Sequence, residues 1–148
     1  MINILTSKRS KIALLIILIT AIIAAVISYK SLNHSVSLTY VTKSYSPLMS
    51  SSRGIEVKAH ANSFYIGSLK YYWSTKHGSF LDSNNVEKKD IVTNEDSSVI
   101  WSAVENGSVV DIKNKFQINL KVINEYNGKV FCEKNITIIP DKNFYTIK

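Results

Sequence analysis

The chain has 148 residues and a formal net charge of +7, with 18 Lys and Arg residues against 11 Asp and Glu residues. Its single cysteine, Cys132, excludes an intramolecular disulfide and a zinc site built from cysteines. Three basic residues, Lys8, Arg9 and Lys11, lie within the first 11 positions. The other 15 basic residues and the 11 acidic residues give the rest of the chain a formal net charge of +4. Such a mildly basic surface predicts no nucleic-acid partner.

An uncharged, apolar segment follows these basic residues. The stretch between Lys11 and Lys30 has 18 residues, and Ile12–Ile27 is apolar except for Thr20. As a helix it reaches about 27 Å, at about 1.5 Å per residue, close to the roughly 30 Å hydrocarbon core of a bilayer. We therefore expect a cytoplasmic basic tail over residues 1–11 and a transmembrane helix over residues 12–29. Because positive charges stay inside, the rest of the chain should lie outside the cytoplasm.

Two other interpretations fit part of this pattern. A cleaved signal peptide has the same basic start, although its apolar region usually spans about 7–15 residues. Val26-Ile27-Ser28 is similar to a small-residue cleavage site, so removal of the segment before Tyr29 stays an alternative and would release a secreted module. A buried core helix would need helical partners, and no other window of the chain shows helical periodicity.

The composition turns to Ser, Thr, Asn and Tyr after the apolar segment. We expect a polar spacer over residues 30–53, in which Val36–Ser44 alternates weakly and is a candidate first strand. Ser46-Pro47 and the serine run 50–52 are typical of a loop. Residues 54–148 then have the size of one domain.

Alternation of apolar and polar residues dominates this domain and predicts β-strands. The clearest patterns are Ile55–Ala61, Ser68–Thr75, Ser98–Ala103, Phe116–Val122 and Val130–Ile139, the last of which should end at Pro140. Glu105–Ser108 indicates a turn, and Asn127-Gly128 is typical of a hairpin between the last two patterns. The polar stretch Asp82–Asp96 should be an exposed excursion with one edge strand. Lys134 interrupts the last pattern, which predicts a bulge or an edge position.

Six to eight short strands, with turn signals about every ten residues, are typical of a β-sandwich. Its core should hold the large side chains on the inward faces of these strands. The core residues predicted in this way are Tyr71, Trp73, Trp101, Phe116, Ile118, Leu120 and Val122.

The segment Tyr71–Phe80 resembles bacterial immunoglobulin-like and PKD-like modules, which have a Tyr-x-Trp strand, a short turn with Gly and then an apolar residue. Val99–Ala103 is similar to their second Trp strand. Phe116–Val122 and Asn127–Val130 are similar to their penultimate strand, hairpin and last strand. The resemblance covers about residues 54–139, without the Gly-Asp-Gly turn of PKD modules or the Cys pair of true immunoglobulin domains. It implies an immunoglobulin-like sandwich of about 7 strands that serves as a non-catalytic spacer, adhesion or binding module.

Candidate contact residues are aromatic. Tyr72 points away from the Trp73 face and is the first candidate for a contact surface, and Tyr65 and His77 are further candidates. The alternative to a buried position for Trp73 and Trp101 is an exposed aromatic platform, which would suit a glycan. The histidines lie apart in the sequence, with no nucleophile motif beside them, and the acids between Asp82 and Asp96 lack the spacing of a calcium loop. We therefore expect no enzyme activity, no catalytic residue, no metal and no cofactor, and we expect Cys132 to be a buried, inert thiol.

These observations predict a membrane-anchored, non-catalytic binding, adhesion or spacer module at the cell envelope. Its partner would be an envelope protein, a wall polymer or a glycan, and the richness in Asn, Lys, Ile and Ser is typical of an AT-rich, Gram-positive genome. The alternative is an accessory subunit of a secretion or transport complex in the membrane. In that case the helix itself would make contacts, through the small residues Ala21, Ala24 and Ala25.

Overall fold

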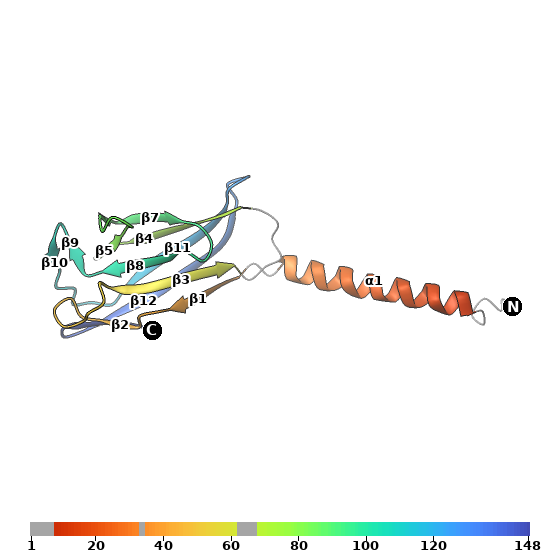
Figure 1. The fold of residues 1–148 in the computed structure, drawn as a ribbon, viewed down its shortest axis with the longest axis horizontal. Coiled ribbons are helices and arrows are strands. Elements are labelled where there is room, and N and C mark those ends of the chain that lie inside the picture. Colours follow the sequence, from red (N-terminus) through yellow and green to blue (C-terminus); the bar gives the residue numbers. More distant parts are fainter. Residues whose placement is uncertain (1–7, 33–34, 62–67) are drawn as a thin grey trace. The chain divides into compact units, whose positions relative to one another are not determined.

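The computed structural model describes residues 8–32, 35–61 and 68–148, which form one α-helix and thirteen strands (Figure 1). The helix and the strands belong to two separate compact units. Tyr65, one of the candidate contact residues, and the first seven residues of the expected basic tail lie outside the described residues.

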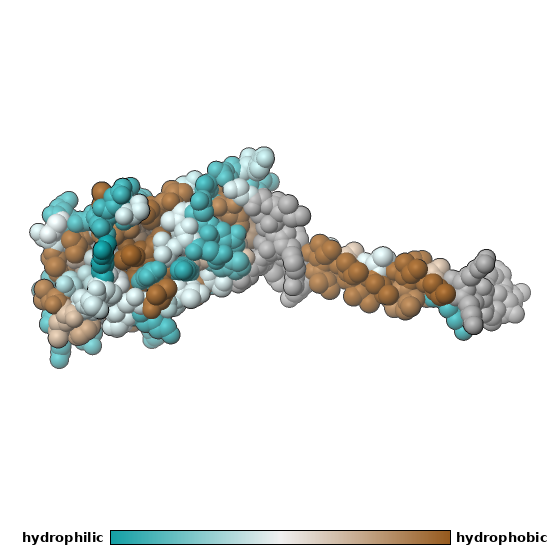
Figure 2. Space-filling model, viewed as in Figure 1, coloured by the Kyte–Doolittle hydropathy of each residue, from teal (hydrophilic) through white to brown (hydrophobic). Residues whose placement is uncertain are grey.

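The helix α1 (Lys8–Leu32) contains the whole apolar segment. Its window Ser10–Ser28 has 19 residues and is long and apolar enough to cross a membrane, although a signal sequence has the same properties. None of the side chains of this window is buried, and its large apolar ones range from 47% exposed at Ile19 to 66% at Ile17. Figure 2 accordingly shows a helix surface that is brown, or hydrophobic, almost throughout.

The first sheet has five strands in the order β1-β3-β8-β5-β6, and all neighbours are antiparallel. Its strands are β1 (Val36–Tyr40), β3 (Ile55–Ala61), β8 (Ser98–Ser102), β5 (Ser79–Leu81) and β6 (Glu87–Lys88).

The second sheet has six strands in the order β2-β13-β12-β11-β4-β7, again antiparallel throughout. Its strands are β2 (Ser44–Tyr45), β13 (Phe144–Ile147), β12 (Val130–Asp141), β11 (Phe116–Asn124), β4 (Leu69–Thr75) and β7 (Asp90–Thr93). A small hairpin of β9 (Val104–Glu105) and β10 (Ser108–Val109) completes the strands. Both residues of its turn, Asn106 and Gly107, have positive φ angles of 52° and 74°, as a type I′ turn requires.

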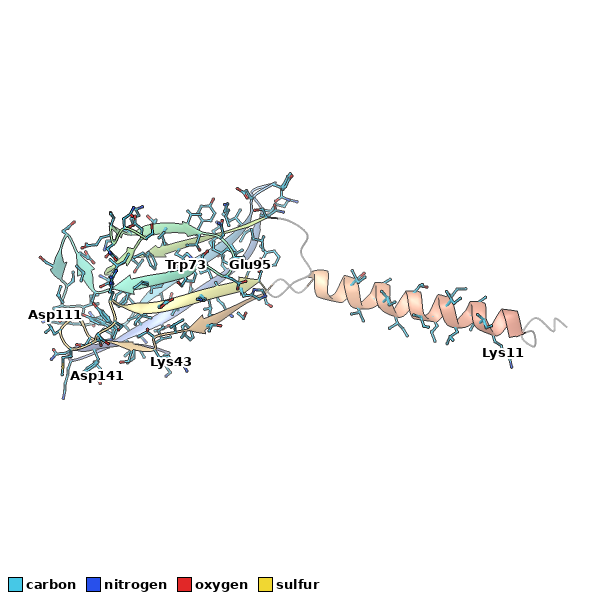
Figure 3. All side chains as sticks on the ribbon, in the orientation of Figure 1. Lys11, Lys43, Trp73, Glu95, Asp111 and Asp141 are labelled. Atoms are coloured by element: carbon cyan, nitrogen blue, oxygen red, sulfur yellow. The ribbon has the colours of Figure 1, made fainter. Side chains whose placement is uncertain are left out.

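The two larger sheets pack face to face and form a β-sandwich. Trp101 of the first sheet lies 5.3 Å from Phe116 and 5.4 Å from Tyr145 of the second, measured between ring centroids. Trp73 comes from the second sheet and is labelled within the body of the sandwich in Figure 3. The seven core residues named from the sequence are all buried: Tyr71, Trp73, Trp101, Phe116, Ile118, Leu120 and Val122. The all-β fold with one N-terminal apolar helix is therefore confirmed.

The sandwich takes in part of the expected spacer. The candidate first strand exists as β1, which pairs with β3 from Val36–Ala61 to Tyr40–Val57. Ser44 and Tyr45 of β2 pair with β13, and the side chain of Tyr45 is buried. The second compact unit accordingly begins at Ser35 rather than at residue 54. These short, polar strands give a weak alternation because each lies at the edge of its sheet.

The end of β12 differs from the sequence prediction. The strand continues through Pro140 to Asp141 and pairs there with β13, a strand that the sequence pattern did not indicate. Proline is tolerated at this point because pairing with β11 ends at Ile138, so that Pro140 has a neighbour on one side only. The bulge lies opposite Val122 and Ile123 rather than at Lys134. Lys134 instead lies where β12 has β11 alone as a neighbour, which is the edge position predicted as the alternative.

Candidate functional site

The outer face of the six-stranded sheet carries the exposed half of each alternating strand. In β4, for example, Tyr71 and Trp73 are buried while Tyr72 between them is 42% exposed. In β11 the same alternation exposes Gln117, Asn119 and Lys121. The central part of this surface, here called the Tyr72 face, consists of Asp90, Val92, Tyr72, Ser74, Gln117, Asn119, Lys121, Glu133, Asn135 and Thr137.

The register of the strands makes Tyr72 the second of four residues in a row that crosses four strands. Tyr72 of β4 lies opposite Val92 of β7 on one side and opposite Lys121 of β11 on the other. Lys121 in turn lies opposite Glu133 of β12, and the Lys121 Nζ–Glu133 Oε1 distance is 3.6 Å. The aromatic ring therefore has an aliphatic neighbour on one side and an ion pair on the other.

A second row, one step along the strands, is polar throughout. Ser74 lies opposite Asp90 of β7 and Asn119 of β11, and Asn119 lies opposite Asn135 of β12. Amide side chains supply both hydrogen-bond donors and acceptors, so this row offers both kinds of group side by side.

A third pair continues the same surface toward the start of β11. Gln117 lies opposite Thr137, and both line a hollow of about 290 Å³ together with Lys115 and Phe116. Gln117 is four residues from Lys121, which corresponds to about 14 Å along an antiparallel strand at about 3.4 Å per residue. The Tyr72 face is therefore a polar track with one aromatic residue near one end and a shallow hollow at the other.

His77, the other described contact candidate, does not join Tyr72. Its side chain is half-buried, and its ring packs edge-on against Phe116, with 5.4 Å between ring centroids. Its carbonyl oxygen accepts hydrogen bonds from Trp101 Nε1 at 2.8 Å and from Thr75 Oγ1 at 2.7 Å. The structure thus gives His77 a role in closing one end of the core.

The structure brings together a cluster that sequence spacing did not reveal. His60 Nδ1 lies 3.1 Å from Asp96 Oδ1 and 3.3 Å from Glu95 Oε1, which also accepts the backbone N–H of Ala61 at 3.3 Å. The buried hydroxyl of Tyr71 lies near this cluster. Burial, together with the nearby charge of Glu95, raises the pKa of this hydroxyl. His60 is about 35 positions from Glu95 and Asp96 in the sequence. It meets them only because β3 lies beside the turn after β7.

Two other acids of the polar excursion are engaged separately. Asp82 Oδ2 lies 2.9 Å from Lys88 Nζ, and hydrogen bonds from that ammonium and from the N–H of Val86 lower the pKa of Asp82. Glu87 Oε1 accepts the N–H of Gly107 at 3.1 Å. Across the described ranges 8–32, 35–61 and 68–148, no three His, Cys, Asp or Glu side chains converge as a metal site.

A second hollow lies near the hairpin between β12 and β13. It has a volume of about 180 Å³, and its lining includes Leu48, Val109, Lys142 and the buried Tyr145. Figure 3 labels Asp111 and Asp141 at this end of the sandwich and Glu95 at the opposite end. Leu48 is 76% exposed, so the rim of the hollow is apolar, but its size suits one side chain rather than an extended ligand.

Cys132 is half-buried rather than fully buried, because it lies on the part of β12 that forms a sheet edge. Its Sγ lies 3.6 Å from the carbonyl oxygen of Glu133.

The comparisons with known proteins give no relative. No family model matches the chain, no curated protein is significantly similar to it, and no solved structure matches it significantly. The function is therefore inferred from the surfaces of the molecule. On the Tyr72 face exposed polar groups surround an aromatic residue, and four strands hold the side chains at fixed spacings.

Proposed function

We propose that this chain is a membrane-anchored, non-catalytic binding module whose sandwich lies outside the cytoplasm. The observation that carries the proposal is the contrast between its two units. The window Ser10–Ser28 is predominantly apolar and none of its side chains is buried, whereas the sandwich has an apolar core of its own. Exposing an apolar surface of this size to water is unfavourable, so a bilayer is the natural environment of the helix.

The orientation follows from the charges that flank the helix. Lys8, Arg9 and Lys11 precede or begin the apolar window, no acid lies among them, and Lys30 alone follows closely. The excess of positive charge at the first end favours a cytoplasmic N-terminus. The sandwich, which comes after the helix, would then face the envelope or the medium.

The strand order supports an immunoglobulin-like assignment for the sandwich. In immunoglobulin domains one sheet has the order A-B-E-D and the other contains C-F-G, with a buried Trp on strand C. Here β1, β3 and β8 take the places of A, B and E, while β4, β11 and β12 take those of C, F and G. Trp73 is the buried residue on β4. One departure is that β5, in the place of strand D, precedes β7 in the sequence.

Binding without catalysis is supported by the character of the polar clusters. The half-buried carboxylates of Asp82, Glu87 and Glu105 are each engaged by a lysine or a backbone N–H. The Tyr72 face has the opposite character, since it is an open surface of amide, hydroxyl and aromatic groups. A partner in the envelope, whether a protein, a wall polymer or a glycan, would meet this surface first.

Cysteine labelling in intact cells tests the location of the sandwich. In a Cys132→Ser background, a cysteine replaces either Tyr126, which is 91% exposed, or Thr6 in the N-terminal segment. We expect a membrane-impermeant maleimide to label the Tyr126→Cys protein in intact cells. The Thr6→Cys protein should be labelled only after permeabilisation.

The same cells show whether the helix is retained. An anchored chain should stay with the membranes after carbonate extraction and have the mass of the full sequence. Labelling of both cysteines only after permeabilisation would place the sandwich in the cytoplasm and refute the proposal. A shortened product in the medium would instead support the signal-peptide alternative.

A further inference from the structure

We propose that the Tyr72 face binds an uncharged, hydroxyl-rich glycan, an inference that rests on the proposed function as a binding module. Its first basis is the geometry of the surface. An aromatic side chain, two asparagines and a serine occupy adjacent positions on β4, β11 and β12, at spacings fixed by the sheet register. Tyr72 presents a flat apolar ring, and Ser74, Asn119 and Asn135 form the next row of outward-facing residues along the strands.

The hydrogen-bonding groups match sugar hydroxyls. A hydroxyl both donates and accepts, and an asparagine side chain offers two donors and one acceptor oxygen. Asn119 and Asn135 are cross-strand neighbours, so they present two amides side by side, and Gln117 with Thr137 repeats a similar pair farther along. A chain of sugar rings laid along the strands would therefore meet complementary groups at successive positions.

The charge of the Tyr72 face favours an uncharged ligand over an anionic polymer. Although the chain is basic overall, the Tyr72 face has one lysine and two acids, Lys121, Asp90 and Glu133. The lysine is engaged by Glu133 at 3.6 Å. A polyphosphate, a nucleic acid or an anionic lipid surface would meet more negative than positive charge here, whereas an uncharged glycan would meet no electrostatic penalty.

The apolar content of the face is too small for a protein interface of ordinary stability. Such interfaces are centred on clusters of buried aromatic and aliphatic anchors. On the Tyr72 face Tyr72 and Val92 are the exposed large apolar side chains, and amides and charges surround them. One aromatic platform within a polar surface fits the stacking of a sugar ring better than it fits a protein partner.

The test is isothermal titration of the full-length chain in a zwitterionic detergent, because sugar-based detergents would compete. The probes are a linear glucose hexamer and a linear N-acetylglucosamine hexamer, with hyaluronan and inorganic polyphosphate as anionic probes. We expect one of the neutral hexamers to bind. Tyr72→Ala should weaken that binding about tenfold, which corresponds to about 1.4 kcal/mol, while Tyr72→Phe should retain it.

The matched control is Tyr126→Ala. Tyr126 is also an exposed tyrosine, but it lies in the loop between β11 and β12, outside the Tyr72 face. Its removal should leave binding unchanged. Asn119→Ala combined with Asn135→Ala provides a second perturbation and should also weaken binding, and unfolding midpoints would show that each variant keeps its fold.

Three titration results would each overturn the inference. They are the absence of binding to either neutral hexamer, equal affinity of the Tyr72→Ala and Tyr126→Ala proteins, and preferential binding of hyaluronan or polyphosphate. Capture of a protein partner through Tyr72, with no glycan binding, would also overturn it. Because the labelling of Tyr126→Cys in intact cells is independent of these titrations, failure of the glycan assignment and failure of the membrane-anchored location can be told apart.

Discussion

Gly78, which follows β4, is a position where one added methyl group should damage the sandwich severely. Its φ angle is +69°, a region that residues with a Cβ adopt at a cost of about 1–2 kcal/mol. A Cβ at this position would collide with the carbonyl oxygen of Ser102 and would lie 2.7 Å from two ring carbons of Trp101. Both neighbours are buried, so neither can move into solvent.

The magnitude for Gly78→Ala follows from three contributions. Backbone strain costs about 1 kcal/mol, and overpacking of a well-filled core costs about 1–3 kcal/mol. Displacement of the Trp101 ring also weakens its hydrogen bond to the carbonyl oxygen of His77, now 2.8 Å long, at about 1 kcal/mol. We therefore expect a loss of about 3–5 kcal/mol, a large part of the roughly 5–15 kcal/mol that stabilises a typical domain.

Gly107→Ala is the matched control for this experiment. Gly107 has a φ angle of +74°, but an added Cβ would meet no atom within 4 Å. This variant should therefore lose only the backbone contribution of about 1 kcal/mol. The difference between the two variants isolates the steric clash with Trp101 and Ser102.

Urea unfolding followed by tryptophan fluorescence measures both variants in the full-length chain. Both tryptophans, Trp73 and Trp101, are in the sandwich, so the signal does not report on the helix. A loss of about 4 kcal/mol, with a slope of about 1–3 kcal/mol per molar urea, lowers the midpoint by about 1–4 M. Equal midpoints for Gly78→Ala and Gly107→Ala would refute the reasoning, because they would mean that the neighbouring side chains yield freely.

Two further perturbations test the charged groups. Lys89 Nζ lies 2.7 Å from Glu105 Oε1, and hydrogen bonds from that ammonium and from the N–H of Gly78 lower the pKa of Glu105. The contribution of the Glu105 carboxylate to folding stability is therefore complete above the ordinary pKa of glutamate. It is lost as the pH falls through the pKa of Glu105 in the folded state. Glu105→Gln should therefore lower the free energy of unfolding by about 1–2 kcal/mol at pH 7. Urea titrations at descending pH should show this stability difference from the wild type disappearing. A difference that persists at pH 2 would contradict this assignment. Lys134 donates to the carbonyl oxygen of Val36 at 2.6 Å from the exposed edge of β12, and charged residues at such edges oppose strand pairing between molecules. Lys134→Val should increase self-association, measured by light scattering, while Lys129→Val in the loop before β12 should not. Identical particle masses for the two variants would count against a role of Lys134 in protecting the strand edge.

Local patterns in the sequence were sufficient for most of the architecture. The alternation of apolar and polar residues predicted β3, β4, β8, β11 and most of β12, because each of these strands has one face in the core and one in solvent. The same alternation identified Tyr72 as exposed between two buried aromatic residues. The apolar run gave the helix, since its composition and length are properties of consecutive residues.

The short strands β2 and β13 escaped prediction because their stability comes from partners distant in the sequence. Two-residue β2 exists because β13 pairs with it, and β13 in turn depends on the continuation of β12 through Pro140. No residue in these segments signals its partner. For the same reason the sequence assigned residues 30–53 to a spacer, although Ser35 onward belongs to the compact unit of the sandwich.

The amino-acid sequence by itself determined the division into an apolar rod and a set of alternating strands, because hydrophobic periodicity depends only on neighbouring residues. The tertiary structure alone decided which strands are neighbours, and with that the row of Val92, Tyr72, Lys121 and Glu133 across four strands. It also decided that His60 meets Asp96 and that His77 closes the core beside Phe116. These contacts depend on strand order and register, which are fixed when the two sheets bury their apolar faces against each other.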